Sequence, residues 1–453
     1  MGKPAKMSHA VSQERTRNYV RQIKGSVVFK GLAVATSFFA IPLMIHYLGQ
    51  EQFGVWSTIL SVLSWIVFFD LGLGNGLRNK LAESIAKNEI AEAARYISYA
   101  YSLIGLISIS SLALMTIATF VIPWQRVFNT QSVTEATLRY TVLIAAVFIF
   151  LNFWISLINQ VLNAIQKTSV VVFGQFLSNA LSLALVFTLT KTTDSSILYL
   201  AAVYGVSLVT SNVLLSIWFY RQSRGLIPSF SLDSQRIRPL LSLGLQFFTI
   251  QFAVLVIFTT DKMLITQLFG PQYVTQYDVV FKLFSMITLI HSLITAPLWS
   301  SYTDAYHRGD FAWIKGILRK QLMIFGMIVL SVIILTPMAK PIIALWIGND
   351  IEVSMPLVIS MGAFVLVSTW NNIFGFVLGG ISKIRLGSFY TIVTAVLNIP
   401  LSYFFAIKLD IGIAGIMLGT VVSICISVIV SPIQVYYFIY TGQNNKFLSS
   451  VLK

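Results

Sequence analysis

The chain has 453 residues, of which 56% are hydrophobic and only 10% are charged, and its mean hydropathy is +0.80. A water-soluble domain carries about 25% charged residues, because its surface must face water. This composition excludes a soluble protein, so lipid must cover most of the surface. The net charge of +15 does not indicate nucleic-acid binding, because the basic residues are scattered among short loops.

Apolar runs of about 20 residues recur along the whole chain, which is the length that a helix needs to cross a hydrocarbon layer of about 30 Å. The spans of a β-barrel would instead alternate apolar and polar residues over about ten positions. The sequence therefore predicts an all-α integral membrane protein with twelve transmembrane helices, at residues 26–47, 54–75, 98–122, 140–162, 170–190, 196–219, 241–268, 274–297, 321–347, 355–379, 387–407 and 413–439.

The connections between these spans are mostly short and leave no room for a separate soluble domain. We expect two lobes of six helices each, a linker between them and a polar tail at each end. The expected boundaries are 1–25 for the N-terminal tail, 26–219 for the first lobe, 220–240 for the linker, 241–439 for the second lobe and 440–453 for the C-terminal tail.

The distribution of Lys and Arg predicts the orientation of the chain. If the N-terminus is cytoplasmic, the cytoplasmic segments hold 23 of these residues, the opposite side holds five and the spans hold three. Cytoplasmic loops of membrane proteins are enriched in Lys and Arg. We therefore expect both termini in the cytoplasm, and we expect some of the basic residues to contact anionic membrane lipids.

A weak internal repeat relates the two halves of the chain. At an offset of 221, Gly49 aligns with Gly270, Phe53 with Val274, and Trp56 with Tyr277. An even number of spans in each half gives both halves the same orientation. The halves should then be related by an axis along the membrane normal, with the substrate path between them.

Six charged residues lie within the predicted spans, where each charge is costly and indicates function. Asp278 and Lys282 are four residues apart and can form an ion pair on one helix face, which would also let them merely neutralise each other. The side chains of Asp261 and Lys262 point about 100° apart, so at least one should face a wet cavity. The remaining two, Lys30 and Asp70, lie near cytoplasmic ends, where Lys30 could instead extend to water.

The segment from Trp65 to Lys80 combines Gly72, Gly74 and Gly76 with nearby polar residues. A phosphate-binding loop is excluded, because no strand precedes the glycines and no lysine followed by Ser or Thr comes after them. The glycines can end span two and allow tight helix packing, or they can unwind the helix and line a substrate entrance. The sequence leaves both interpretations open.

Residue patterns for enzymatic or metal chemistry are missing from the sequence. No group of His, Cys and carboxylates has metal-ligand spacing, so we expect no metal and no other cofactor. No nucleophile with an adjacent base lies in the short outer loops, so we expect no catalytic residue. His291 could relay protons, but a core histidine is the simpler interpretation. Cys425 is expected to be a small packing residue.

Three segments resemble those of Wzx-type flippases, which export O-antigen and capsule repeat units and belong to the multidrug/oligosaccharidyl-lipid/polysaccharide (MOP) exporter superfamily. They are RNYVRQIKGSVVFKG at 17–31, PLMIHYLGQEQFGVWSTILSVLSWIVFFDLGLGNGLRNKLAE at 42–83, and DKMLITQLFG at 261–270 followed by Tyr277. The resemblance covers the full length, and residues 53–83 are its most specific part.

This resemblance implies two six-helix lobes around a central cavity, and a substrate that is an undecaprenyl-diphosphate-linked oligosaccharide. Such a flippase would move its substrate from the cytoplasmic to the periplasmic leaflet of the bacterial inner membrane by alternating access, driven by an ion or proton gradient. The implied partners are glycan polymerases and ligases, and we expect a monomer.

The charged residues fit an anionic lipid headgroup independently of this resemblance, because Lys and Arg can neutralise a diphosphate. The candidates for this role are Lys30, Arg78, Lys262 and Lys282, with Arg21 and Lys24 at the cytoplasmic mouth. The candidates for ion coupling are Asp70, Asp261 and Asp278, because a buried carboxylate can change protonation during a cycle. Aromatic and amide side chains within the spans would contact the sugars, and the candidates are Asn152, Trp154, Asn159, Trp299, Trp370, Asn371 and Asn372.

Two other functions remain open. An organic-cation antiporter of the same superfamily should line its cavity with acidic and aromatic residues, whereas here three basic and three acidic residues balance within the spans. A membrane enzyme such as a glycan polymerase, ligase or acyltransferase would need a catalytic loop outside the bilayer, and the outer loops are short.

Overall fold

The computed structural model describes residues 4–70, 72–231, 259–295, 298–307, 309–381, 383 and 385–440. In these residues every regular element is a helix, so the all-α prediction is confirmed. The chain forms two compact units: unit 1 comprises Met1–Val127 and Gln131–Phe248, and unit 2 comprises Phe128–Thr130 and Thr249–Lys453. Residues 232–240 of the expected linker, 241–258 of the expected seventh span and 441–453 of the C-terminal tail lie outside the described residues.

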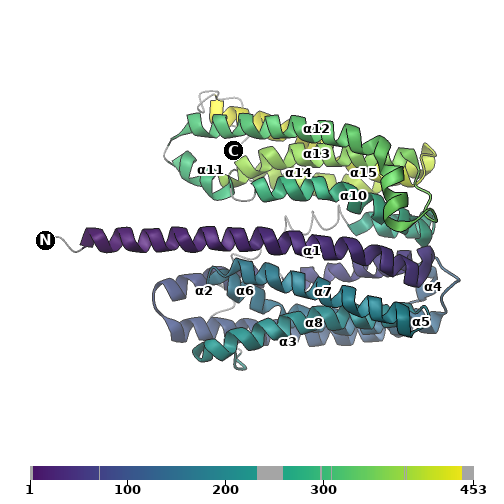
Figure 1. Cartoon of the computed structure of the whole chain (residues 1–453), viewed down its shortest axis with the longest axis horizontal. Helices are drawn as coiled ribbons and strands as arrows, with labels where there is room; N and C mark the ends of the chain where they lie inside the picture. The colour runs from purple at the N-terminus through teal and green to yellow at the C-terminus, as the bar shows by residue number, and fades with distance from the viewer. Residues whose placement is uncertain are drawn as a thin grey trace. The chain divides into compact units, whose positions relative to one another are not determined.

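In its described part, unit 1 consists of α-helices and two short 3-10 helices, joined by short turns (Figure 1). Its elements are α1 (Pro4–Leu63), the 3-10 helix η1 (Ser64–Asp70), α2 (Leu73–Ala86), α3 (Ile90–Val121), α4 (Trp124–Val127), α5 (Glu135–Ile155), α6 (Leu157–Ala164), α7 (Thr168–Thr192), α8 (Ile197–Gln222) and the 3-10 helix η2 (Arg224–Leu226).

Unit 2 begins, in its described part, with helical residues 259–268 that end at Gly270. It continues with α10 (Pro271–Thr295), α11 (Leu298–His307), α12 (Phe311–Ile347), α13 (Met355–Gly380), α14 (Arg385–Tyr403), the π-helical turn η4 (Phe404–Lys408) and α15 (Ile413–Tyr440).

Ten helical stretches in the described residues are long and apolar enough to cross a membrane. Their outer faces expose large apolar side chains, such as Leu114 on α3 (69% exposed) and Leu345 on α12 (91% exposed). Apolar faces of this extent are stable only against lipid. The chain is therefore a multi-pass membrane protein.

The first of the ten stretches, Lys24–Ile66, contains the first predicted span, 26–47, and the first part of the second, 54–75. Gly49 interrupts α1 with φ 77° and ψ 168°, and residues on both sides of it line a common pocket. The helix therefore folds back at Gly49, which counts as two crossings. With this reversal, and with residues 241–258 of the seventh span outside the description, the ten stretches are compatible with the predicted twelve.

Several helix boundaries differ from the expected spans. The first helix begins at Pro4, within the expected polar tail. The second span ends in η1, and the chain continues as α2 beyond Gly72, which has a left-handed backbone (φ 77°). The fourth span is divided at Ser156 into α5 and α6. The hydropathy pattern does not predict these helix breaks, because they depend on local backbone geometry.

The helices α1 and α7 pack in a regular register in unit 1 (Figure 1). Gln22 accepts hydrogen bonds from Ser169, Asn179 donates to the Ala33 carbonyl oxygen, and Tyr47 bonds Thr193. The partners are 146 or 147 residues apart in each case. Residues 22–47 of α1 thus run side by side with α7, and this seam positions Lys30.

Each unit has its own apolar core. In unit 1 the core joins α2, α3, α6 and α8 through residues such as Leu77, Ile97 and Phe219. In unit 2 it joins α12, α13 and α15 through residues such as Ile314 and Val377.

Candidate functional site

Lys30 is a basic residue within the first apolar stretch of unit 1, Lys24–Ile66. Its Nζ donates a hydrogen bond of 3.0 Å to Oε1 of Gln175 on α7, and the side chain is half-buried. In the described part of the chain no carboxylate lies within ion-pair distance of this lysine. A neutral amide orients the ammonium group without cancelling its charge. The position therefore keeps a net positive charge about 9 Å along α1 from Lys24.

Two other cationic candidates of unit 1 are more solvent-accessible than Lys30. Lys24 on α1 and Arg78 on α2 are exposed, and the side chain of Arg21 lies outside the description. On the same helix as Arg78, Glu83 forms ion pairs with Lys87 at 2.7 Å and with Lys80 at 2.9 Å. The hydrogen bonds from Lys87 and then Lys80 lower the pKa of Glu83 to about 2. The Glu83 carboxylate thus pairs with two lysines of this surface, and it does not pair with Arg78.

Asp70 has a structural contact at the start of α2. Its Oδ1 accepts a hydrogen bond of 2.9 Å from the backbone N–H of Gly74, one of the amides that a helix start leaves without an internal partner. A side chain at Gly74 would meet Gln160 of α6 at 3.3 Å. These contacts support the packing interpretation of the glycine-rich segment, and they do not test the entrance interpretation.

In unit 2, Lys262 and Asp278 form an ion pair with 2.7 Å between Nζ and Oδ1. Their side chains are 24% and 12% exposed. The sequence predicted a pair between Asp278 and Lys282 on one helix, and the structure joins Asp278 to a lysine on the neighbouring helix. The pair with Lys282, which is half-buried on α10, stays a prediction.

Asp261 lies beside this pair, fully within unit 2, and is 1% exposed. Its carboxylate accepts a hydrogen bond of 3.0 Å from the Tyr277 hydroxyl and bonds of 3.1 and 3.2 Å from the Thr420 hydroxyl. Thr420 in turn accepts from Asn398, which accepts from Thr260. Four helical segments thus supply one buried polar network.

This network leaves the charge of Asp261 without a cationic partner among the described residues. The hydroxyl groups donate hydrogen bonds to the carboxylate oxygens, but they do not neutralise the negative charge. A buried carboxylate without a counter-charge carries a large free-energy cost. A proton or a bound cation would compensate the charge. The arrangement suits a group that gains and loses its counter-charge during a cycle.

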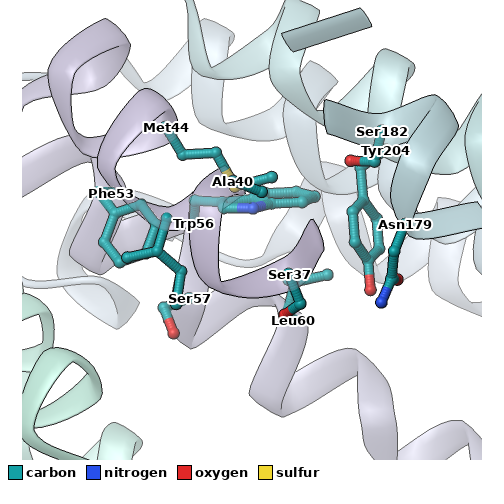
Figure 2. A pocket seen from close by; sticks show the side chains of 11 residues that line it. Ser37, Ala40, Met44, Phe53, Trp56, Ser57, Leu60, Asn179, Ser182 and Tyr204 are labelled. Carbon is teal, nitrogen blue, oxygen red and sulfur yellow. The ribbon is translucent and has the colours of Figure 1, made fainter. Parts of the chain in front are cut away.

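A pocket inside unit 1 was not predicted from the sequence. It is a half-open pocket of about 170 Å³ between the two limbs of α1, α7 and α8, and its lining is mostly apolar. Figure 2 shows Met44, Trp56 and Tyr204 around it, with Asn179 beside the ring of Tyr204. The rings of Trp56 and Tyr204 meet edge to face, with 5.4 Å between their centroids. The hydroxyl oxygen of Ser182, also labelled in Figure 2, is buried and has no hydrogen-bond partner in the described structure.

Several residues predicted to contact sugars instead hold helices together. Asn212 on α8 donates to Asn152 at 2.8 Å and accepts from Asn159 at 3.0 Å. Trp154 donates to the Tyr101 carbonyl oxygen, and Trp370 donates to that of Val428. Interhelical amide and indole bonds of this kind are common in membrane proteins. Trp299 and Asn372 are exposed, and no contact with a sugar is tested for any member of the set.

The internal repeat could have located both the network and the pocket. The aligned residues Gly49 and Gly270 have positive φ values of 77° and 108°, and the aligned residues Trp56 and Tyr277 are both buried. Trp56 lines the unit 1 pocket, and Tyr277 binds Asp261. The described residues contain no cluster of three or more His, Cys, Asp or Glu that could hold a metal ion.

The family model described as "Polysaccharide biosynthesis protein" matches residues 8–302, about two thirds of the chain. The chain belongs to the polysaccharide biosynthesis protein family. This membership, together with the relatives and solved structures below, confirms the resemblance that was based on residues 17–31, 42–83 and 261–270 with Tyr277.

Relatives of this polysaccharide biosynthesis protein span nearly its whole length. One from Salmonella typhimurium, provisionally named an O-antigen transporter, is 23% identical over 89% of this chain and 91% of its own length. One from Yersinia pseudotuberculosis, provisionally named an O-antigen export protein, is 21% identical over 88% and 91%. The membrane protein EpsK of Bacillus subtilis is 23% identical over 89% of this chain and 80% of its own length.

Solved structures of MOP superfamily transporters share the fold of this family member. An inward-facing multidrug resistance transporter of the MATE family has a TM-score of 0.75 at 15% identity and covers 93% of this chain and 99% of its own. A MOP superfamily transporter from Pyrococcus furiosus has a TM-score of 0.64 at 15% identity over 94% and 96%. At this identity the likeness shows the fold alone.

Proposed function

We propose that this protein is a flippase that moves an undecaprenyl-diphosphate-linked oligosaccharide, such as an O-antigen or capsule repeat unit, across the bacterial inner membrane. The substrate enters from the cytoplasmic leaflet and leaves in the periplasmic leaflet by alternating access, with both termini in the cytoplasm. Membership of the polysaccharide biosynthesis family supports this proposal. So do the relatives from Salmonella and Yersinia, which are named for O-antigen transport or export.

The observation that carries the proposal is the net charge of Lys30. A lysine within the first apolar stretch, bonded to an amide and without a carboxylate among its described partners, attracts an anion. A diphosphate is the part of the proposed substrate that most needs such a partner, because it leaves water during translocation. The proposed route also uses Arg21, Lys24, Arg78, Lys262 and Lys282.

Coupling to an ion gradient is assigned to Asp261, with Asp278 and Asp70 as further candidates. The Asp261 network supports this role, because its hydroxyl and amide oxygens surround a carboxylate that requires a compensating proton or cation. The protein acts as a monomer and passes its substrate to polymerases and ligases of glycan assembly. It has a transport role and no catalytic one.

The proposed function is tested by a leaflet assay in sealed proteoliposomes. A radiolabelled undecaprenyl-diphosphate oligosaccharide is placed in both leaflets, and an external glycosidase digests the sugar chains that reach the outer one. The proposal predicts that digestion proceeds to completion with the protein and stops near half in protein-free vesicles. In a parallel arm, uptake of ethidium without movement of the glycolipid would overturn the flippase and favour an organic-cation antiporter.

A further inference from the structure

The loop between α4 and α5 leaves unit 1 for three residues. Val127 and Gln131 belong to unit 1, whereas Phe128–Thr130 between them belong to unit 2 by their contacts. We call residues 128–130 the clip. The corresponding loop of the second half, residues 348–354 between α12 and α13, stays within its own unit. The clip is therefore a feature of the first half that the internal repeat does not duplicate.

The clip is buried at both ends and hydrogen-bonded at its centre. Phe128 is 1% exposed, and Thr130 is 3% exposed. Between them, Nδ2 of Asn129 donates to the carbonyl oxygens of Thr266 at 3.1 Å and Gln267 at 3.3 Å. We call these two carbonyls the seat of the clip. Asn129 has φ 47°, a left-handed conformation that asparagine adopts more readily than most residues.

The seat lies at the end of the helical segment that carries the main candidate for ion coupling. Helical residues 259–268 end at Gly270, and the last carbonyls of a helix lack partners within the helix. Asn129 supplies a donor to two of them, and the backbone N–H of Gly270 supplies a second donor to Thr266. Asp261 lies five residues before Thr266, about 8 Å along the helix axis. A reorientation of this segment at Asp261 therefore also moves the seat.

The short length of the clip limits how far its flanking chain can move away from unit 2 while the clip stays bound. Three residues span about 10 Å when fully extended. The chain returns to unit 1 at both ends of the clip. A separation of the two units at this end therefore either withdraws the clip from unit 2 or is prevented by it.

We propose that the clip must leave unit 2 before the outer end of the transporter can open, and that Asn129 is a positioning residue that couples Asp261 to this release. The inference rests on the proposed function, from which it takes the outer orientation of this loop and the role of Asp261. While the clip is bound, Asn129 holds the end of the Asp261 segment. A change of the counter-charge at Asp261 reorients this segment, and the altered seat releases the clip.

Release of the clip is measured by cysteine labelling of the full-length protein in nanodiscs, with Cys425→Ser as the background. The Thr130→Cys variant reports the clip, and a charged maleimide is the probe. Val133→Cys is the matched control, because Val133 is 5% exposed in the same loop but belongs to unit 1. Asn129→Gly removes the amide and tolerates the positive φ. Asn88→Gly makes the same change at an exposed asparagine of unit 1 with φ 62°.

The Thr130→Cys variant should label slowly, because the clip is bound most of the time. Asn129→Gly should accelerate its labelling about two- to fivefold, as expected for the loss of one hydrogen bond, and Asn88→Gly should leave it unchanged. Asp261→Asn should change the labelling rate about threefold or more, and Asn129→Gly should abolish this change. The Val133→Cys variant should stay protected throughout, which also reports that each protein is folded.

The need for release is tested by cross-linking the clip to its seat in proteoliposomes, again with Cys425→Ser. The pair Asn129→Cys and Gln267→Cys is joined by a short, reducible bis-methanethiosulfonate, and glycolipid translocation is followed with the external glycosidase. The control pair is Gln125→Cys and Val133→Cys, because Gln125 donates to the Val133 carbonyl oxygen at 2.9 Å within unit 1. Cross-linking should stop translocation in the clip pair, dithiothreitol should restore it, and the control pair should translocate throughout.

Full translocation by the cross-linked clip pair, failure of this pair to cross-link, or equal labelling of Thr130→Cys with and without Asn129→Gly would overturn the role of the clip. Additive effects of Asp261→Asn and Asn129→Gly on the labelling rate would overturn the coupling through Asn129. The labelling needs no glycolipid. If the wild type translocates none, the proposed function fails, and the labelling still decides whether the clip is released.

Discussion

At the scale of single residues, Asp261 differs from the other charged residues of the spans in its surroundings. Its partners are the hydroxyls of Tyr277 and Thr420, whereas Asp278 pairs with Lys262 and Lys30 bonds an amide. Hydroxyl donors stabilise a carboxylate without supplying charge. Among these residues, Asp261 is therefore the best candidate to bind and release a compensating proton or cation.

Asp261→Asn should uncouple transport from the ion gradient. The amide keeps the shape of the side chain and can still accept from Tyr277, but it needs neither a proton nor a cation. We expect substrate binding to persist, while the acceleration of translocation by an imposed proton or sodium gradient is lost. Translocation is measured in proteoliposomes with and without the gradient.

The control for this variant is Asp410→Asn, an exposed loop position with φ 54°, which asparagine adopts readily. It should respond to the gradient as the wild type does. An Asp261→Asn protein that still responds to the gradient would contradict the assignment.

Asp70 has two roles that a pair of substitutions can separate. As an acceptor for the Gly74 amide it caps α2, and Asp70→Asn preserves this acceptor while Asp70→Ala removes it. We expect Asp70→Ala to lose about 1 kcal/mol of stability and Asp70→Asn to lose little. Thermal unfolding in detergent measures both.

The translocation rate of the Asp70→Asn variant in proteoliposomes then shows whether Asp70 also takes part in ion coupling. The coupling proposal predicts that Asp70→Asn folds normally and transports slowly. Wild-type transport by Asp70→Asn would leave the helix cap as the role of this residue.

At the scale of elements, the sharp reversals of the chain depend on glycine. Gly49 joins the two limbs of α1 with φ 77° and ψ 168°, a backbone conformation that is essentially restricted to glycine and costs other residues roughly 1–3 kcal/mol. A side chain at Gly49 would meet no atom within 4 Å, so the cost of a substitution comes from the backbone alone. The aligned Gly270 has φ 108° at the corresponding turn of unit 2.

Gly49→Ala should therefore lower the melting temperature, and Gly316→Ala should raise it. Gly316 lies within α12 in equally open surroundings, where alanine is the better helix former by roughly 0.5–1 kcal/mol. The two variants carry the same chemical change, so opposite shifts isolate the effect of φ. Shifts of the same sign would contradict the reversal at Gly49.

The positions of the helices could be predicted from the sequence, because a membrane requires about 20 apolar residues at a time. The contacts between helices could not. Spacing along one helix suggested Asp278 with Lys282, while the observed partner of Asp278, Lys262, lies 16 residues away on another helix. The pocket was missed for the same reason, since Ser37, Trp56, Ser182 and Tyr204 each resemble ordinary packing residues until three helices bring them together.

At the scale of the whole molecule, the two units repeat one plan with different chemistry. Unit 1 carries a lysine bonded to an amide and a neutral pocket, and unit 2 carries a buried carboxylate network beside an ion pair. Under the proposed function, Lys30 of unit 1 is the main candidate for contact with the anionic glycolipid, and Asp261 of unit 2 is the main candidate for contact with the coupling ion.

The central claim is that the charge of Lys30, within the first apolar stretch, accepts the diphosphate of the substrate. The leaflet assay tests it in Lys30→Gln beside Lys191→Gln, an exposed lysine at the opposite end of the unit 1 seam. The account predicts at least a tenfold slower translocation of the undecaprenyl-diphosphate oligosaccharide for Lys30→Gln, from the loss of one charge-assisted contact of about 1.5–3 kcal/mol, and a wild-type rate for Lys191→Gln. A wild-type rate for Lys30→Gln would contradict the account.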